Sequence, residues 1–252
     1  IKAEFKNVVD LIFDVYKDFG ITDYRCVLSL RDPEDKEKYH PDDEMWNKAE
    51  NELREVLNEL GIEYTEEIGE AAFYGPKLDV NVTPAVGNEY TLSTCQLDFC
   101  LPAKFDLKYV DKDGEKKTPV VLHRAILGSL DRFMAYILEE TKGALPTWLA
   151  PTQVKVIPVN PELHSEYGKE ITNLLKENDI RVELDDRNEK LGYRLREAQT
   201  EKVPYTLILG DQEKENSTIS YRLFGQKDTA TVSKEEFVKL LNEEISTKAL
   251  RK

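Results

Sequence analysis

The sequence lacks the features that mark secreted, membrane-spanning and metal-cluster proteins. Its 252 residues include only three cysteines and three histidines. The cysteines form no CxxC pair, so we expect no disulfide framework and predict a reducing, cytoplasmic compartment. No run approaches the roughly 20 apolar residues that a membrane-spanning helix needs. The chain opens at Ile1 on an amphipathic stretch, which predicts no signal peptide and a chain cut from something longer.

Positive charge is also scarce. The formal net charge is −14, from 35 Lys and Arg against 49 Asp and Glu. This excess excludes general, sequence-independent binding of nucleic acid, because phosphates would be repelled. A local basic surface stays open: Arg187, Lys190 and Arg194 recur at helical spacing, with Arg196 and Lys202 nearby. The pattern fits either a solvated helix face or a patch that contacts phosphate or RNA.

The first half of the chain has the pattern of an α+β domain. Apolar residues at three- and four-residue steps predict amphipathic helices at 1–19 and 45–60. Strand-forming stretches are found at 24–30, 62–67, 77–84 and 89–101, and a "DKDG" turn predicts a hairpin within 105–123. Helices flanking hairpin-type strands predict an antiparallel sheet.

Two details of this half are predicted from periodicity. In 77–84, Leu78, Val80 and Val82 should face the core, and Asp79 and Asn81 should face outward. A further helix should follow, with one buried apolar stripe formed by Leu127, Leu130, Phe133, Met134, Ile137 and Leu138.

A segment rich in Gly and Pro, "TKGALPTWLAPTQ", interrupts the periodicity and predicts a domain boundary. We therefore expect one domain at 1–145, a linker at 146–152 and a second domain at 153–252. Beyond the boundary, strands alternate with helices. This alternation predicts a mixed or parallel sheet covered by helices, a three-layer α/β domain.

Several polar residues could carry chemistry, and the residues alone leave each interpretation open. His123 ends a predicted strand and has no ligand partner at metal-binding spacing, so it is either a metal ligand or a hydrogen-bonded structural histidine. The other two histidines, His40 and His164, are expected to be solvated. Arg132 lies beside an apolar helix residue, where it could stack on a base and pair with phosphate, or form an ion pair with Asp131 or Glu70.

Two shorter stretches raise the same kind of alternative. Tyr74 and Lys77 lie in a tight turn ahead of a strand, so they either face a ligand or form an ordinary hairpin turn with a solvated lysine. Thr94, Gln96 and Asp98 share one strand face at period two. Three polar side chains on one face indicate either the floor of a site or a wet outer face.

Five motifs, in order along the chain, carry a resemblance to a known family. They are "AAFYGPKLD" at 71–79, "STCQLDF" at 93–99, "VVLHRAILGSLDRF" at 120–133, "LPTWLAP" at 145–151 and "DDRNEKLGYRLREAQ" at 185–199. In residue identity and spacing they resemble the threonyl-tRNA synthetase family, and the resemblance covers the whole chain. The resemblance implies the later part of a class II catalytic domain, with an antiparallel sheet flanked by helices, followed by a mixed-sheet α/β anticodon-binding domain.

The resemblance also implies an activity. Such enzymes activate threonine with ATP and Mg²⁺ to threonyl-adenylate and transfer it to threonine tRNA, largely by positioning and charge neutralisation. By motif position, the residues expected to bind threonine and the reacting groups are Tyr74, Lys77 and Asp98. Those expected to bind ATP are Thr94, Gln96, Ser129 and Arg132. His123 matches one of three zinc ligands, and the residues expected to read the anticodon are Asn188, Arg196, Glu213 and Arg222.

The departures from the family pattern limit what these residues can do alone. The family's first two motifs and its other two zinc ligands are absent from the sequence, Asp131 stands where the third motif usually has Glu, and Thr91 and Leu92 replace a Gln-Cys. We predict that the chain by itself neither activates threonine nor holds zinc tightly, and that the parent enzyme is a homodimer. The alternative is a non-catalytic tRNA-binding protein derived from a synthetase. The joint presence of Tyr74, Lys77, His123 and Arg132 argues against it.

Overall fold

The computed structural model describes residues 1–85 and 87–250. The chain divides into two compact units, Ile1–Tyr136 and Ile137–Lys252. The division falls inside helix α4 (Leu130–Glu140), after residue 136, whereas the sequence predicts that the first domain ends at residue 145. The limits of the expected domains therefore stay a prediction.

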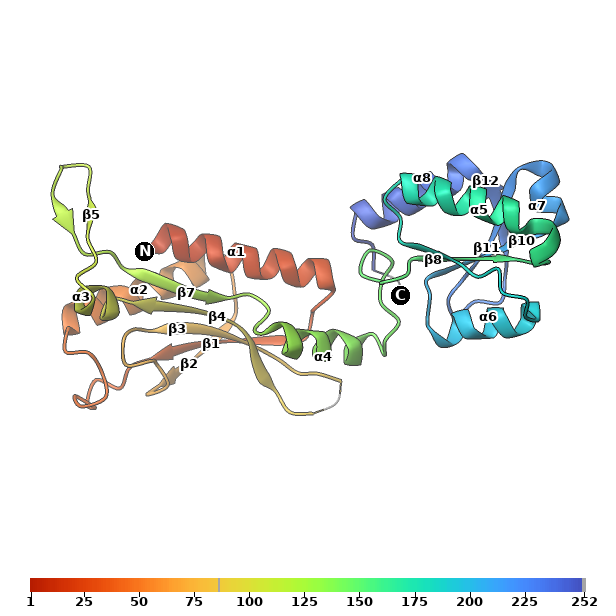
Figure 1. Ribbon diagram of the computed structural model, residues 1–252. Coiled ribbons are helices and arrows are strands. Elements are labelled where there is room, and N and C mark those ends of the chain that lie inside the picture. The colour runs from red at the N-terminus through yellow and green to blue at the C-terminus, as the bar shows by residue number, and fades with distance from the viewer. Residues whose placement is uncertain (86, 251–252) are drawn as a thin grey trace. The chain divides into compact units, whose positions relative to one another are not determined.

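The first unit contains a five-stranded sheet whose strand order is β2-β1-β3-β4-β7 (Figure 1). Its strands are β1 (Tyr24–Leu30), β2 (Tyr64–Ile68), β3 (Lys77–Val82), β4 (Tyr90–Asp98) and β7 (Val121–Ala125). Its other elements are α1 (Lys2–Phe19), α2 (Asp43–Glu59), α3 (Leu101–Lys104) and a small hairpin of β5 (Tyr109–Val110) and β6 (Lys116–Lys117). All the strands expected from alternation are present, and so are both amphipathic helices.

The core of this unit lies between one face of the sheet and the two long helices. On that face Leu78, Val80 and Val82 are buried, as their alternation predicts. Helix α1 contributes Phe5 and Ile12, both fully buried, because its apolar residues recur on one side. Asp42 directly precedes helix α2, and its carboxylate accepts the backbone N–H of Met45 and so caps the first turn. The opposite face of the sheet is left for polar side chains.

Two expectations for this unit are wrong in detail. The sheet is mixed, because β2 runs parallel to β1, while β3, β4 and β7 are antiparallel to their neighbours. The cause is the connection: α2 links β1 to β2, and a helical crossover returns the chain in the same direction. The apolar stripe of α4 is only partly buried: Phe133 and Ile137 are 7% and 5% exposed, but Leu130 is 76% exposed.

The second unit contains a sheet with the order β12-β11-β10-β8-β9. Its strands are β8 (Val154–Pro158), β9 (Val182–Leu184), β10 (Tyr205–Leu209), β11 (Thr218–Leu223) and β12 (Ala230–Ser233). The helices are α5 (Pro161–Glu177), α6 (Leu191–Thr200), α7 (Asp211–Asn216) and α8 (Lys234–Ser246). Strands β8, β9 and β10 are parallel and β11 and β12 antiparallel, so the predicted mixed sheet is confirmed.

Helices cover both faces of this second sheet. Figure 1 shows α5 and α8 on one side and α6 on the other. The α5–α8 side is an apolar core that includes Val156, Leu207, Ile171 and Phe237, all fully buried. Every residue of β8 is buried, as expected for a central strand covered on both sides. The predicted three-layer α/β arrangement is confirmed.

One histidine expected in solvent is buried in this unit. His164 is 2% exposed, because its imidazole links the starts of two helices. Its Nδ1 accepts the backbone N–H of Asn160 at 3.1 Å, and its Nε2 lies 2.9 Å from the Asp211 carboxylate. Short-range spacing gave no sign of Asp211, which is 47 residues away.

Candidate functional site

A row of polar side chains crosses three strands on the free face of the first sheet. Lys77 of β3 pairs with Gln96 of β4, and Gln96 pairs with His123 of β7. Residues directly opposite one another on neighbouring strands project to the same face. The three residues expected to serve threonine, ATP and zinc are therefore neighbours, although they are up to 46 positions apart in the printed sequence.

The turn before β3 is held close to β4 by a glycine. A Cβ added to Gly75 would lie 2.1 Å from the carbonyl oxygen of Leu97, closer than any side chain tolerates. The contact is reinforced by backbone hydrogen bonds from Leu97 N–H to the Pro76 carbonyl, at 3.0 Å, and from Phe99 N–H to the Tyr74 carbonyl, at 3.4 Å. The glycine therefore fixes Tyr74 against the strand that carries Gln96.

Tyr74 joins the polar row through its hydroxyl. The hydroxyl donates to Oε1 of Gln96 at 2.7 Å, and the ring centroid lies 5.7 Å from that of His123. Partial burial raises the pKa of Tyr74, and the nearby negative charge of Asp98 adds a smaller increase. The phenol thus stays protonated at neutral pH and orients the Gln96 amide.

Asp98 lies two residues after Gln96 on the same face of β4, and it is only 1% exposed. Its Oδ1 accepts the backbone N–H groups of Cys100 and Leu101, at 3.0 and 2.8 Å, and its Oδ2 lies 2.9 Å from Nε2 of His123. A carboxylate on one ring nitrogen fixes the tautomer and leaves Nδ1 as the free acceptor. Asp98 therefore orients His123, while Thr94 and Gln96 on the same strand face are half-buried.

Thr94 and Asp79 complete the polar face beside this row. Asp79, expected to face solvent, is only 7% exposed, because Lys77 Nζ lies 2.5 Å from its carboxylate and Ser29 donates to the same oxygen. Thr94 is its register partner, and the Thr94 hydroxyl is buried with no hydrogen-bond partner among the described residues. An unpaired buried hydroxyl is uncommon and points to a missing polar contact. The only sequence signal for this role of Asp79 is its period-two spacing from Lys77 in the same strand.

The start of α4 carries the remaining two candidates. Ser129 accepts the backbone N–H of Arg132 through its hydroxyl at 3.4 Å, and Arg132 lies over the ring of Tyr90 at 5.7 Å. The turn before the helix needs Gly128, whose φ of 65° favours glycine. The Arg132 guanidinium is exposed and stacked on an aromatic ring, so its free edge can meet an anion.

Sequence reasoning missed a buried chain of hydroxyls that supports this turn. The hydroxyl of Tyr16, on α1, lies 2.7 Å from that of Ser93, on β4. Ser93 in turn donates to the carbonyl of Ile126, just before the turn. Both side chains are essentially buried, and burial raises the pKa of Tyr16. The contact spans 77 residues, so no local pattern could have shown it.

The described residues do not by themselves form a zinc site. His123 has Asp98 as its partner, and no group of three His, Cys, Asp or Glu side chains able to hold a metal occurs within residues 1–85 and 87–250. A structural or catalytic zinc takes at least three protein ligands. The arrangement fits one oriented imidazole ligand and no more.

In the second unit, the candidates for reading RNA share the α6 side of the sheet. Arg222 of β11 pairs with Thr206, which pairs with Lys155, so all three face the same way. Glu213 reaches this side by accepting the Ser220 hydroxyl at 2.7 Å, and it also accepts the backbone N–H of Gly210 at 2.9 Å. The Nε of Arg222 is buried without a partner among the described residues.

Of the other two candidates, Asn188 lies in the loop before α6 and Arg196 lies in α6, and both are exposed. The structure thus brings the four residues to one side of the sheet. Glu213, however, uses both carboxylate oxygens in local hydrogen bonds.

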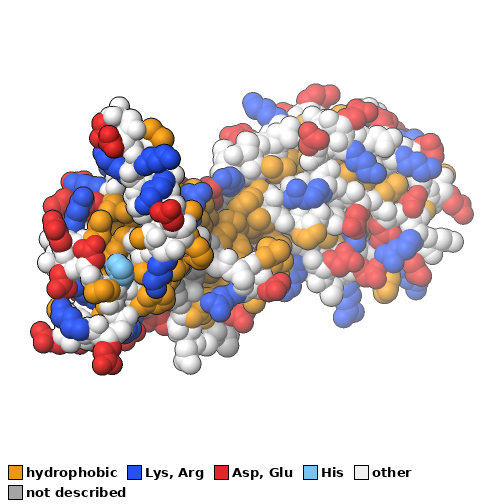
Figure 2. Space-filling model, turned by 60° about the vertical axis from the view of Figure 1, so that its left-hand side comes forward, with side chains coloured by type: hydrophobic (Ala, Val, Ile, Leu, Met, Phe, Trp, Pro, Cys, Tyr) orange, Lys and Arg blue, Asp and Glu red, His pale blue; other side chains and the backbone are white. Residues whose placement is uncertain are grey.

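The basic residues at helical spacing, which fit either a solvated helix face or a basic patch, do not share one exposed surface. Arg194 is fully buried, and Arg187 pairs with the carboxylates of Asp185 and Glu197. These partners raise the pKa of Arg187, and Arg187 lowers the pKa of Asp185. Figure 2 shows both signs of charge intermixed on the visible face. Binding of RNA here would depend on individual residues rather than on a strong positive field.

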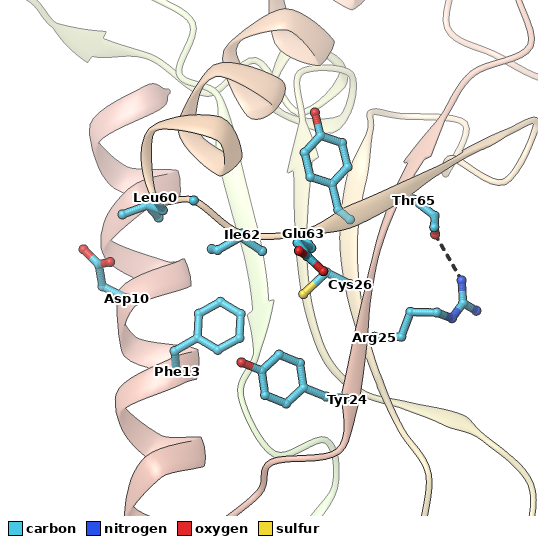
Figure 3. Close-up of a pocket in the computed structure, with 11 residues that line it drawn as sticks. Asp10, Phe13, Tyr24, Arg25, Cys26, Leu60, Ile62, Glu63 and Thr65 are labelled. Atoms are coloured by element: carbon cyan, nitrogen blue, oxygen red, sulfur yellow. Dashed lines mark hydrogen bonds between the residues drawn. The ribbon is translucent and has the colours of Figure 1, made fainter.

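A cavity of about 820 Å³ lies elsewhere in the first unit, between α1, the start of β1 and the α2–β2 turn. Figure 3 shows Phe13 and Tyr24 side by side in it, with the carboxylate of Asp10 at one edge. Its lining includes none of the residues expected at the site. The cavity is therefore separate from the polar face of the sheet.

Comparison with known proteins assigns a family to both units. Residues 1–141 match the tRNA synthetase class II core domain (G, H, P, S and T), and residues 153–244 match an anticodon binding domain. The chain is 57% identical, over its full length, to the threonine–tRNA ligase of Staphylococcus aureus (strain JH9), of which it covers 39%. It therefore spans well under half the length of that relative.

Solved structures share the fold. The RNA binding domain of threonyl-tRNA synthetase from Cryptosporidium parvum Iowa II superimposes with a TM-score of 0.86 at 31% identity, over 96% of this chain and 60% of that one. A prolyl-tRNA synthetase from Cryptosporidium parvum superimposes with a TM-score of 0.60 at 16% identity, over 98% of this chain and 48% of that one. The second likeness concerns the fold alone.

Proposed function

Since the chain belongs to the threonyl-tRNA synthetases of class II, we propose that it forms part of a ligase that joins threonine to threonine tRNA. In the first step a carboxylate oxygen of threonine attacks the α-phosphorus of ATP, and the bond to pyrophosphate breaks. In the second, a hydroxyl of the terminal ribose attacks the acyl carbon, and AMP leaves. The observation that carries the proposal is the row Lys77–Gln96–His123 on one sheet face, with Tyr74 bonded into it.

The residues of this face suit the chemistry without covalent catalysis. Tyr74, Lys77 and Asp98 would position threonine and the reacting groups, with the Lys77 ammonium held by Asp79 so that its charge is fixed in place. Thr94 and Gln96 would meet the adenosine. Ser129 and Arg132, with Mg²⁺ brought by ATP, would hold the phosphates.

The test of the catalytic face is threonine-dependent exchange of pyrophosphate into ATP, measured on the protein at the length of its relatives. We expect Lys77→Met and Arg132→Met each to lower exchange by roughly 100-fold, the usual effect of removing one transition-state contact. Lys108→Met is the matched control, because Lys108 is an exposed lysine directly before β5 that pairs with Asp106. Exchange that survives Lys77→Met unchanged would refute the assignment.

The 252 residues alone should not catalyse this exchange, because they supply one oriented imidazole and lack the family's first two motifs. We likewise expect the isolated polypeptide to lose zinc on dialysis, measured by elemental analysis. Exchange above background, or stoichiometric zinc, would contradict these expectations. We further propose that the complete enzyme is a homodimer. Its cytoplasmic location stays a prediction.

For the second unit we propose recognition of the threonine anticodon by Asn188, Arg196, Glu213 and Arg222. Amide, guanidinium and carboxylate groups can pair with the edges of splayed bases, the usual way in which single-stranded RNA is read. Fluorescence anisotropy with labelled RNA hairpins tests the idea. A hairpin with the threonine anticodon should bind more tightly than hairpins with one anticodon base changed. Equal binding of all hairpins would remove the proposal and would favour a different role for this unit.

A further inference from the structure

Arg194 is a fully buried cation whose guanidinium donates to three backbone carbonyls. Nη1 donates to the carbonyl of Asp185 at 2.8 Å and Nε to that of Glu189 at 3.2 Å. Nη2 donates to the carbonyl of Val159 at 3.3 Å. A buried charge is costly unless its hydrogen bonds are made, so these three contacts define where the surrounding backbone can lie.

Two of the three carbonyls belong to one loop, between β9 and α6, and the third follows β8. Asp185 follows the end of β9, Glu189 precedes α6, and Val159 follows the end of β8. Residues 185–190, which we name the recognition loop, are thus held at both ends by one side chain. Between the two fixed points lies Asn188, whose side chain is exposed.

A second set of contacts stiffens the same loop. The Asp185 carboxylate, 4% exposed, accepts Arg187 Nε and Nη2, each at 2.8 Å. The backbone N–H of Glu189 donates to the Arg187 carbonyl at 2.8 Å, which closes a tight turn around Asn188. Asn188 therefore sits at the tip of a loop whose shape is set before any ligand arrives.

We infer that Arg194 is a positioning residue for anticodon recognition: its guanidinium holds the recognition loop so that Asn188 meets one base of the anticodon. The inference rests on the proposed function of the second unit. An amide that reads a base edge needs a defined direction, and a loop already in the bound conformation loses less freedom on binding. Arginine meets these three carbonyls with donors on three separate nitrogens of a rigid fork, whereas the three donors of lysine share one nitrogen on a flexible stem.

The experiment uses the 252-residue chain and four RNA hairpins: one with the threonine anticodon and three with one anticodon base changed each. Asn188→Ala identifies the base that Asn188 reads, as the position where discrimination falls. We expect Arg194→Lys, which keeps the charge, to reduce discrimination about tenfold at that same position and to leave the other two unchanged. The double variant should lose no more than Asn188→Ala alone, because both act through one contact.

Arg181→Lys is the matched control. Arg181 also donates to backbone carbonyls, those of Ala150 and Trp148, but it does not contact the recognition loop. It should leave all four affinities unchanged. Arg194→Met, which removes the charge and keeps an apolar chain of similar length, carries the same expectation as Arg194→Lys, so the test stands if one variant fails to fold.

The outcomes separate the inference from the function on which it rests. If the unchanged chain binds all hairpins equally, the proposed function fails. If Asn188→Ala loses discrimination at one base and Arg194→Lys does not, only the positioning role fails. A loss that is equal for all four hairpins would overturn it as well, because a merely structural role weakens binding without regard to the base.

Discussion

Gly75→Ala is the change from which the structure predicts most. The added methyl would lie 2.1 Å from the Leu97 carbonyl oxygen, whereas real side chains do not approach within 3.0 Å. The turn must therefore move by about 0.9 Å, the difference between these distances. Gly75 does not have a positive φ, so the substitution acts through this collision and not through backbone strain.

The cost can be estimated from what the movement breaks. Crowding in a packed region costs about 1–3 kcal/mol. Weakening the two backbone hydrogen bonds of the turn, Leu97 to Pro76 and Phe99 to Tyr74, adds roughly 0.5–1.5 kcal/mol each. A total near 3–4 kcal/mol corresponds to a fall of roughly 10 °C in melting temperature for a protein of this size. The Tyr74–Gln96 hydrogen bond should be lost with the turn.

Differential scanning calorimetry checks this prediction, since it resolves the transitions of separate units. Gly192→Ala is the matched control: it lies in α6 with nothing within 4 Å of the added methyl. Alanine in that helix should stabilise by about 0.4–1 kcal/mol, so the two identical substitutions should have opposite signs. If Gly75→Ala melts at the same temperature as the unchanged protein, the close approach of the turn to β4 does not stabilise the site.

Three further changes follow from buried ionisable groups. Burial raises the pKa of Glu50, so its charge destabilises the folded state at neutral pH. Glu50→Gln should raise the denaturant midpoint of unfolding at pH 7. This gain in stability should vanish as the pH falls through the folded-state pKa of Glu50, because the native carboxylate then becomes neutral as well. A gain that stays constant with pH would contradict this. The hydrogen bonds from Arg187 lower the pKa of Asp185. Asp185→Asn should therefore reduce the free energy of unfolding by about 1–2 kcal/mol at pH 7, and by progressively less below about pH 4. A loss of stability that persists in acid would exclude the ion pair as its source. All three cysteines are buried, and burial raises the pKa of Cys95 to about 12 and that of Cys26 to about 11. A thiol-specific disulfide reagent at pH 8 should therefore label them only in denaturant, and rapid labelling of the native protein would contradict this.

The sequence predicted the elements of the fold because their signals are local. The steps of apolar residues in α1 and α2 and the alternation in β3 arise within one element, and the structure reproduces them. The short elements α3, α7 and β12 were missed, since four to six residues carry too little periodicity to stand out. The direction of β2 was also missed, because it depends on how a crossover returns to the sheet.

The sequence by itself determined which family the chain resembles and which side chains are available, since the residues of a motif and their spacing are properties of the linear chain. Only the tertiary structure decided which of those side chains act together. Lys77, Gln96 and His123 became neighbours through strand register, and Asp98 became the partner of His123. Arg194, which helical spacing placed on a surface face of the helix, is buried, and its guanidinium donates to two carbonyls of the loop before α6 and to that of Val159, 35 residues away. Burial of this charge depends on carbonyls outside the helix, and helical spacing does not encode where those carbonyls lie.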